Sequence, residues 1–158
     1  MGTEIERKFL VKDDSWRRDA GPGILLRQGY LAAGEGLSVR VRTDGQRAWL
    51  TVKGPSEGLS RAEFEYAVPT EDAAALLGLC GARLVEKRRH RLEHSGHLWE
   101  IDEFLGANAG LIMAEVELRQ ADQAVAQPDW VGPEVSGDKR FENASLSQSP
   151  YGVWGPRL

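Results

Sequence analysis

This chain of 158 residues has little of three things: cysteine, long apolar runs and excess charge of one sign. Cys80 is the only cysteine, so no internal disulfide bond can form, and we expect a reducing compartment, the cytoplasm. No apolar run approaches the roughly 18 residues of a membrane span, and charge begins at Glu4, where a signal segment would be apolar. The formal net charge of −4 argues against binding through bulk positive charge. We therefore expect neither a membrane nor a nucleic acid as partner.

Alternation of apolar and polar residues dominates the chain, and this period of two is typical of β-strands. It predicts eight strands, at 3–12, 24–31, 37–43, 47–53, 60–68, 84–92, 97–104 and 111–118. One clear helix is expected at 71–79, with Thr70 as its N-cap, and short helices are expected at 121–126 and 143–148. Residues 1–148 then form a single domain, and 149–158, with two prolines and two glycines, form a flexible tail.

Eight strands with one clear helix favour an α+β chain dominated by β-structure: a closed eight-stranded antiparallel β-barrel with helices packed outside. The charged faces of the strands support closure, because a face that meets solvent normally mixes charge signs. Here pairs of one sign recur: Glu4/Glu6, Arg40/Arg42, Glu63/Glu65, Lys87/Arg89, Glu100/Asp102 and Glu115/Glu117. If these faces point inward, they line a tunnel whose basic residues bind an anion and whose acidic residues hold metal ions.

The first strand carries the sharpest of these patterns. Glu4, Glu6 and Lys8 share one face, because alternate side chains of a strand point the same way. Two adjacent carboxylates on one face repel each other unless a positive charge lies between them. A divalent cation would supply that charge, and Lys8 would suit an anion bound to the cation. The spacing therefore predicts a combined metal and phosphate site.

The ordered series of motifs resembles the CYTH superfamily, also called the triphosphate tunnel metalloenzymes. The resemblance runs to about Leu146, and its segments include Glu4-Ile5-Glu6-Arg7-Lys8-Phe9-Leu10, Arg40-Val41-Arg42, Thr51-Val52-Lys53, Val85-Glu86-Lys87-Arg88-Arg89, Glu115-Val116-Glu117 and Asp138-Lys139-Arg140-Phe141-Glu142-Asn143. The short chain and the segment Leu59-Ser60-Arg61-Ala62-Glu63 are most similar to the small bacterial inorganic triphosphatases of this group. The resemblance implies a tunnel, a Mg²⁺ or Mn²⁺ cofactor, and hydrolysis of a small-molecule substrate, inorganic tripolyphosphate, to pyrophosphate and phosphate.

The resemblance also implies roles for individual residues. The implied catalytic residues are Glu4, Glu6 and Lys8. The implied metal ligands are Glu4, Glu6, Asp102, Glu115 and Glu117. The implied phosphate-binding residues are Lys8, Arg40, Arg42, Lys53, Lys87, Arg89 and Lys139. Glu63 and Glu65 are expected in the tunnel without an assigned role, and the sequence leaves the oligomeric state open.

Other functions stay open at this point. An organic triphosphatase, acting on thiamine triphosphate or a nucleoside triphosphate, and an adenylate cyclase share the fold; a non-catalytic polyphosphate-binding module belongs to another class. A zinc site is not favoured, because His90, His94 and His97 flank a turn without paired cysteines. A surface nucleic-acid patch is not favoured either, because alternation separates Arg88 from the basic face of its strand.

Overall fold

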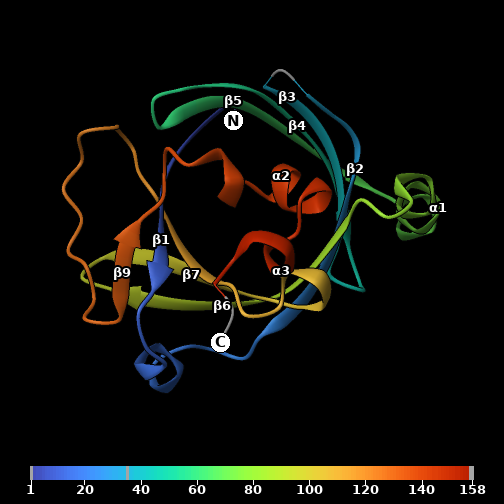
Figure 1. Ribbon diagram of the computed structural model, residues 1–158. Coiled ribbons are helices and arrows are strands. Elements are labelled where there is room, and N and C mark those ends of the chain that lie inside the picture. The colour runs from blue at the N-terminus through green and yellow to red at the C-terminus, as the bar shows by residue number, and fades with distance from the viewer. Residues whose placement is uncertain (1, 35, 157–158) are drawn as a thin grey trace.

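Nine strands form one antiparallel sheet that closes into a barrel (Figure 1). The computed structural model describes residues 2–34 and 36–156. In sheet order the barrel strands are β5 (Ser60–Val68), β4 (Ala48–Glu57), β3 (Leu37–Thr43), β2 (Ile24–Gly34), β6 (Leu84–His94), β7 (His97–Phe104), β8 (Ile112–Glu117) and β1 (Thr3–Val11). Pairing of β1 with β5 closes the ring. The predicted closed barrel of eight antiparallel strands is confirmed.

The ninth strand lies outside the closure. β9 (Val131–Glu134) pairs with the C-terminal end of β1. The sequence pattern did not predict it, because Gly132 and Pro133 interrupt the alternation in a segment of only four residues. The eight predicted strands, by contrast, differ from the observed ones by four residues or fewer at any end.

Strand β1 is shared between two neighbours, and this sharing positions the acidic residues. Its first part pairs with β5, where Glu4 lies opposite Arg61. Its middle part pairs with β8, where Glu6 lies opposite Glu117 and Lys8 lies opposite Glu115. Because directly opposed side chains on one face are close neighbours, the acidic pair of β1 meets the acidic pair of β8.

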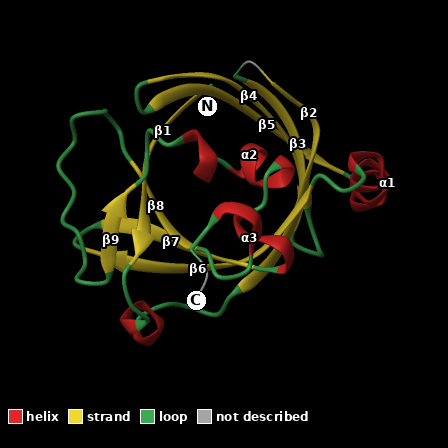
Figure 2. Cartoon of the chain, in the orientation of Figure 1, coloured by secondary structure: helices red, strands yellow, loops and turns green. Residues whose placement is uncertain are grey.

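The helices occupy two different places (Figure 2). Helix α1 (Thr70–Cys80) lies outside the barrel, as predicted, and packs on strands β2, β3 and β4. Its buried residues Ala73, Leu77 and Cys80 contact Val41 and Ala48 on the outer face of the sheet. None of the helices in the described part of the chain combines the length and apolar character that crossing a membrane requires.

The C-terminal helices close one end of the barrel instead of packing outside it. Helices α2 (Asn143–Gln148) and α3 (Tyr151–Trp154) lie within the ring of strands in Figure 1. At this end the inward positions of β6, β7 and β8 turn apolar, and Val85, Phe104 and Met113 pack there against Phe141 and Leu146. These apolar residues need cover from water, and the C-terminal segment supplies it.

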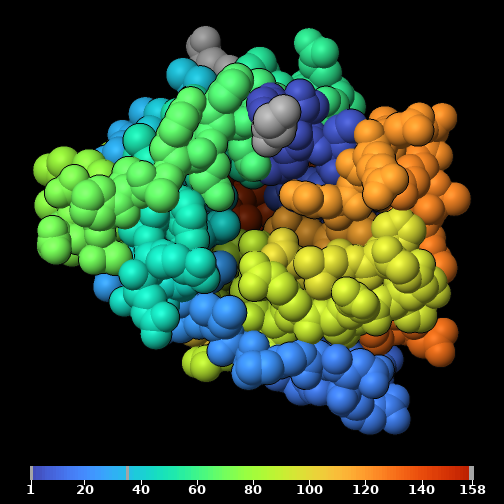
Figure 3. Space-filling view, turned by 180° about the vertical axis from the view of Figure 1, so that it is seen from behind, coloured from blue at the N-terminus to red at the C-terminus, as the bar shows by residue number. Residues whose placement is uncertain are grey.

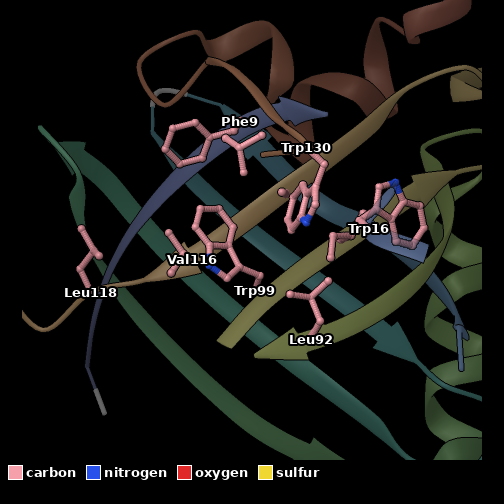
Figure 4. Packing of buried hydrophobic residues seen from close by; sticks show 10 residues of the cluster. Phe9, Trp16, Leu92, Trp99, Val116, Leu118 and Trp130 are labelled. Atoms are coloured by element: carbon pink, nitrogen blue, oxygen red, sulfur yellow. The ribbon is translucent and has the colours of Figure 1, made fainter. Parts of the chain in front are cut away.

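The largest apolar cluster lies on the outer face of the barrel (Figure 4). There Phe9 and Trp99 have ring centroids 5.7 Å apart, and Trp99 meets Trp130 edge-on at 5.6 Å. The 3₁₀-helix η1 (Ser15–Arg18) covers the cluster with the fully buried Trp16. Two further 3₁₀-helices are η2 (Gly106–Asn108) and η3 (Lys139–Phe141). Because the largest apolar cluster lies outside the barrel, the rest of the interior can hold charge.

Two segments differ from the sequence prediction. The helix expected at 121–126 is a turn followed by irregular chain. Six residues are too few to form a helix without a packed face, and only Val125 of this segment contacts the core. The tail expected to be flexible from Ser149 contains α3, where the Tyr151 backbone N–H donates to Asn108 Oδ1 at 2.8 Å. Trp154 packs edge-on against Phe141 at 5.2 Å. These aromatic contacts were not readable from the Pro and Gly content of the tail.

Candidate active site

The charged faces of the strands meet in a cavity of about 620 Å³ inside the barrel. Figure 3 shows a hollow in the centre of the molecule, with C-terminal atoms at its bottom. Among the described residues the wall carries nine basic side chains, Lys8, Arg40, Arg42, Lys53, Arg61, Lys87, Arg89, Arg91 and Lys139. It carries eight acidic ones, Glu4, Glu6, Glu63, Glu65, Glu100, Glu115, Glu117 and Glu142. Every site residue named from the sequence lines this cavity except Asp102.

Asp102 lies behind the wall and neutralises two of its cations. Its Oδ2 is 2.7 Å from Lys87 Nζ, and Arg89 donates to both of its oxygens at 2.7 and 2.8 Å. Burial disfavours the charged carboxylate, but Arg89 and Lys87 outweigh this effect and lower the pKa of Asp102. With both oxygens engaged and no exposed surface, Asp102 fits an internal counter-ion better than the metal ligand that the family resemblance implies.

The two arginines of β3 keep donors free for an anion. Arg40 Nη2 donates to Thr51 Oγ1 at 3.1 Å, and its buried Nε has no hydrogen-bond partner in the structure. Arg42 Nε donates to Gln28 Oε1 at 2.9 Å. Burial, together with the charges of Arg40 and Arg89, lowers the pKa of Arg42 to about 9. A negatively charged ligand would relieve this crowding of positive charge.

On the acidic side of the cavity, β1 carboxylates contact lysines. Lys53 Nζ lies 2.9 Å from Glu4 Oε2 and 3.3 Å from Glu63 Oε2, and Lys8 Nζ lies 3.5 Å from Glu6 Oε1. Burial and the neighbouring Glu63 raise the pKa of Glu4 despite Lys53. Burial opposes the charge of Lys8, but the surrounding carboxylates outweigh it and raise the pKa of its ammonium group.

The β8 carboxylates carry the strongest crowding of negative charge. Burial, and next the charge of Glu6, raises the pKa of Glu115 and also that of Glu117. Glu117 is affected further by Glu4 and Glu100. A cation placed among these groups would stabilise their ionised forms.

The donor chemistry of this acidic side fits a hard divalent cation. Carboxylate oxygens are the ligands that Mg²⁺ and Mn²⁺ prefer. In the described part of the chain, however, no group of three or more acidic, His or Cys side chains is arranged to hold a metal ion. Two of the carboxylates, Glu4 and Glu6, are turned toward Lys53 and Lys8. Binding of a cation therefore requires these side chains to turn away from their lysines.

Three residues in the cavity wall or directly behind it have no counterpart among the site residues predicted from the sequence. Gln28 is fully buried on β2, and Asn143 begins α2; both contact the basic residues of the wall. Arg61 lines the cavity and donates to the carbonyl oxygen of Gly54 at 2.7 Å. The signal for Gln28 was its place as an amide between Leu26 and Tyr30 on the inward face of β2. Asn143 belongs to a segment that carries the family resemblance, but the sequence assigned it no role, because its partners Lys87 and Gln28 lie far away in sequence.

A second, smaller cavity of about 200 Å³ adjoins the main one and shares four of its side chains, Arg42, Glu65, Arg89 and Arg91. Trp49 lies in its wall with the Arg47 guanidinium 5.8 Å from its ring centroid. The three histidines line neither cavity; His90 instead packs edge-on against Trp16 at 4.9 Å.

The fold and the site define a closed β-barrel that encloses a cavity for a small, highly charged ligand. The chain belongs to the CYTH family, since the CYTH domain matches residues 2–149. It is 45% identical to an inorganic triphosphatase of Acetivibrio thermocellus, over 96% of this chain and 97% of that protein. It is 37% identical to an inorganic triphosphatase of Nitrosomonas europaea, over 93% and 98% of the two chains. A crystal structure of an inorganic triphosphatase superposes with a TM-score of 0.66 at 34% identity, covering 91% of this chain and 97% of that one.

Proposed function

We propose that this protein is a divalent-metal-dependent inorganic triphosphatase that hydrolyses tripolyphosphate to pyrophosphate and phosphate inside the barrel. The observation that carries the proposal is the enclosed cavity with nine basic and eight acidic side chains. The relatives at 45% and 37% identity bear the name inorganic triphosphatase, and the family is metal-dependent in general.

The basic side chains bind and orient the substrate in this proposal. Arginine can hold a phosphate group through two parallel hydrogen bonds, whereas lysine acts as a point charge. Arg40, Arg42 and Lys87 line the cavity together. The remaining phosphate-binding candidates are Lys8, Lys53, Arg89 and Lys139.

The acidic side chains of β1 and β8 hold the metal in this proposal, namely Glu4, Glu6, Glu115 and Glu117. When bound, Mg²⁺ or Mn²⁺ would neutralise phosphate charge and make a water molecule more acidic. A water oxygen attacks the terminal phosphorus, the bond to the bridging oxygen breaks, and pyrophosphate leaves with that oxygen. A carboxylate of the acidic side accepts the proton that the attacking water loses.

The test is phosphate release from tripolyphosphate, thiamine triphosphate, ATP and pyrophosphate, each with Mg²⁺ and with Mn²⁺. We expect turnover of tripolyphosphate far above that of the other three. Faster turnover of an organic triphosphate would replace the proposed substrate. Tight binding of tripolyphosphate without phosphate release would indicate a binding module, because the carboxylates would then serve no catalytic purpose.

A further inference from the structure

The first residue of α2 reaches two buried polar groups of the barrel wall. Asn143 Oδ1 accepts from Lys87 Nζ at 3.0 Å and from Gln28 Nε2 at 3.2 Å. Gln28 Oε1 in turn accepts from Arg42 Nε at 2.9 Å, and Gln28 Nε2 also donates to the Tyr30 hydroxyl at 3.1 Å. One chain of hydrogen bonds therefore links the helix that closes the barrel to two basic residues of the cavity.

The orientation of both amides follows from chemistry. An ammonium or guanidinium group only donates hydrogen bonds. Asn143 must therefore present its oxygen to Lys87, and Gln28 must present its oxygen to Arg42. This leaves the Gln28 amino group facing the Asn143 oxygen, where it donates. The reversed orientation of either amide would place a donor against a donor. Only one arrangement therefore satisfies Lys87, Asn143, Gln28 and Arg42 together.

This arrangement directs the donors of Lys87. Its side chain has no exposed surface, and Asp102 and Asn143 engage two of its three N–H groups. The ammonium group is tetrahedral, so these two contacts set the direction of the third N–H. Lys87 also lines the cavity. Arg42 is constrained similarly, since Gln28 takes its Nε and leaves the terminal N–H groups for a ligand.

We propose that Asn143 and Gln28 are positioning residues that hold Lys87 and Arg42 toward the phosphate chain of the substrate. This inference rests on the proposed function. Asn143 adds a second property, because it belongs to α2 and thus ties substrate binding to the seating of the helix that closes the barrel. A neutral amide suits this place, since a carboxylate there would repel a polyanion.

A double-mutant cycle on tripolyphosphate hydrolysis tests the proposal. Asn143→Leu should lower kcat/KM by about 10- to 100-fold, the usual worth of a hydrogen bond to a charged group. Lys87→Met should lower it further, and the double variant should be no worse than Lys87→Met alone, because Asn143 acts through Lys87. Combining Asn143→Leu with Lys53→Met should instead multiply the two losses, since Lys53 contacts Glu4 and Glu63. Multiplied losses for Asn143→Leu with Lys87→Met would overturn the proposal.

Two further variants separate positioning from general damage to the C-terminal segment. Asn108→Ala removes the anchor of α3 without touching the cavity, so it should lower Tm and leave kcat/KM unchanged. Asn143→Asp keeps both acceptor contacts and adds a negative charge, so it should raise KM with little loss of kcat. A loss of kcat/KM in Asn108→Ala as large as that in Asn143→Leu would overturn the positioning role.

Binding of tripolyphosphate, measured by calorimetry in EDTA, and its cleavage, measured with Mg²⁺, together distinguish this inference from the proposed function. If the wild type binds and cleaves tripolyphosphate and Asn143→Leu binds and cleaves it equally well, the positioning role alone is overturned. Wild type that neither binds nor cleaves tripolyphosphate would overturn both. Weaker binding by folded Asn143→Leu, with the Asn108→Ala control unchanged, supports the inference without any need for turnover.

Discussion

The role of Asp102 gives the most direct test of the charge arrangement. Asp102→Asn keeps the shape of the side chain and removes the charge that neutralises Lys87 and Arg89. All three groups are buried, so water compensates poorly for the lost carboxylate. The counter-ion interpretation therefore predicts a large loss of stability, and the family-based role as a metal ligand predicts a loss of metal binding.

The expected size follows from the contacts. Removing one partner of a buried ion pair costs about 3–5 kcal/mol in unfolding free energy. Arg89 keeps weaker contacts to Glu100 at 3.3 Å and Glu115 at 3.7 Å, which places the expected loss within that range instead of above it. For a chain of this length, the loss corresponds to a fall in Tm of about 6–20 °C.

The measurement is thermal and urea unfolding followed by circular dichroism, with and without Mn²⁺. The matched control is Asp138→Asn, which removes a carboxylate from the exposed pair with Arg140 and should cost at most about 1 kcal/mol. If Asp102→Asn unfolds within about 1 kcal/mol of wild type, the counter-ion argument is wrong. If the variant is destabilised but loses the rise in Tm on adding Mn²⁺, Asp102 belongs with the metal ligands.

Three further predictions concern the acidic side of the cavity. Glu4→Gln and Glu6→Gln should each abolish tripolyphosphate hydrolysis with an unchanged circular dichroism spectrum, and retained turnover would refute their catalytic assignment. Mn²⁺ at 100 times its Kd should raise Tm by about 5–11 °C, and EDTA should reverse the rise. A Tm that changes with neither Mn²⁺ nor EDTA would contradict the metal site. Burial raises the pKa of Glu4, Glu115 and Glu117, so the folded protein keeps protons that the unfolded chain releases. Without metal, the urea midpoint should fall as pH rises above about 4.3, and a midpoint that rises from pH 5 to 7 would refute this.

The barrel was predictable because its determinants are local. Alternation along each strand placed the strands, and turn residues marked their ends: Gly45 and Gly96 have the positive φ angles, 94° and 80°, that tight turns require. The structure of the C-terminal segment, by contrast, depends on contacts between residues that are far apart in sequence. Trp154 and Phe141 stabilise it through contacts with each other and with the apolar end of the barrel interior, and Pro and Gly content carries no information about such contacts.

The same distinction applies to the site. Alternation along a strand decides which side chains point inward. The sequence therefore placed Glu6, Lys8 and Arg40 correctly in the wall of one cavity. Alternation also placed Asp102 on the inward face, but it does not indicate that Lys87 and Arg89 engage both oxygens of its carboxylate. The contact of Asn143 with Lys87 spans 56 sequence positions, and no pattern of neighbouring residues indicates such a contact.

The near balance of charge in the cavity argues for a ligand that brings both signs. Nine basic and eight acidic side chains almost cancel among the described residues, so the cavity as a whole offers little net attraction for a polyanion. The charges are separated, however: burial and like charges lower the pKa of Arg42 on one side and raise that of Glu115 on the other. A polyphosphate alone would relieve the basic side and worsen the acidic side, and a divalent cation alone would do the reverse. A complex of the two relieves both, so metal and tripolyphosphate should each strengthen the binding of the other.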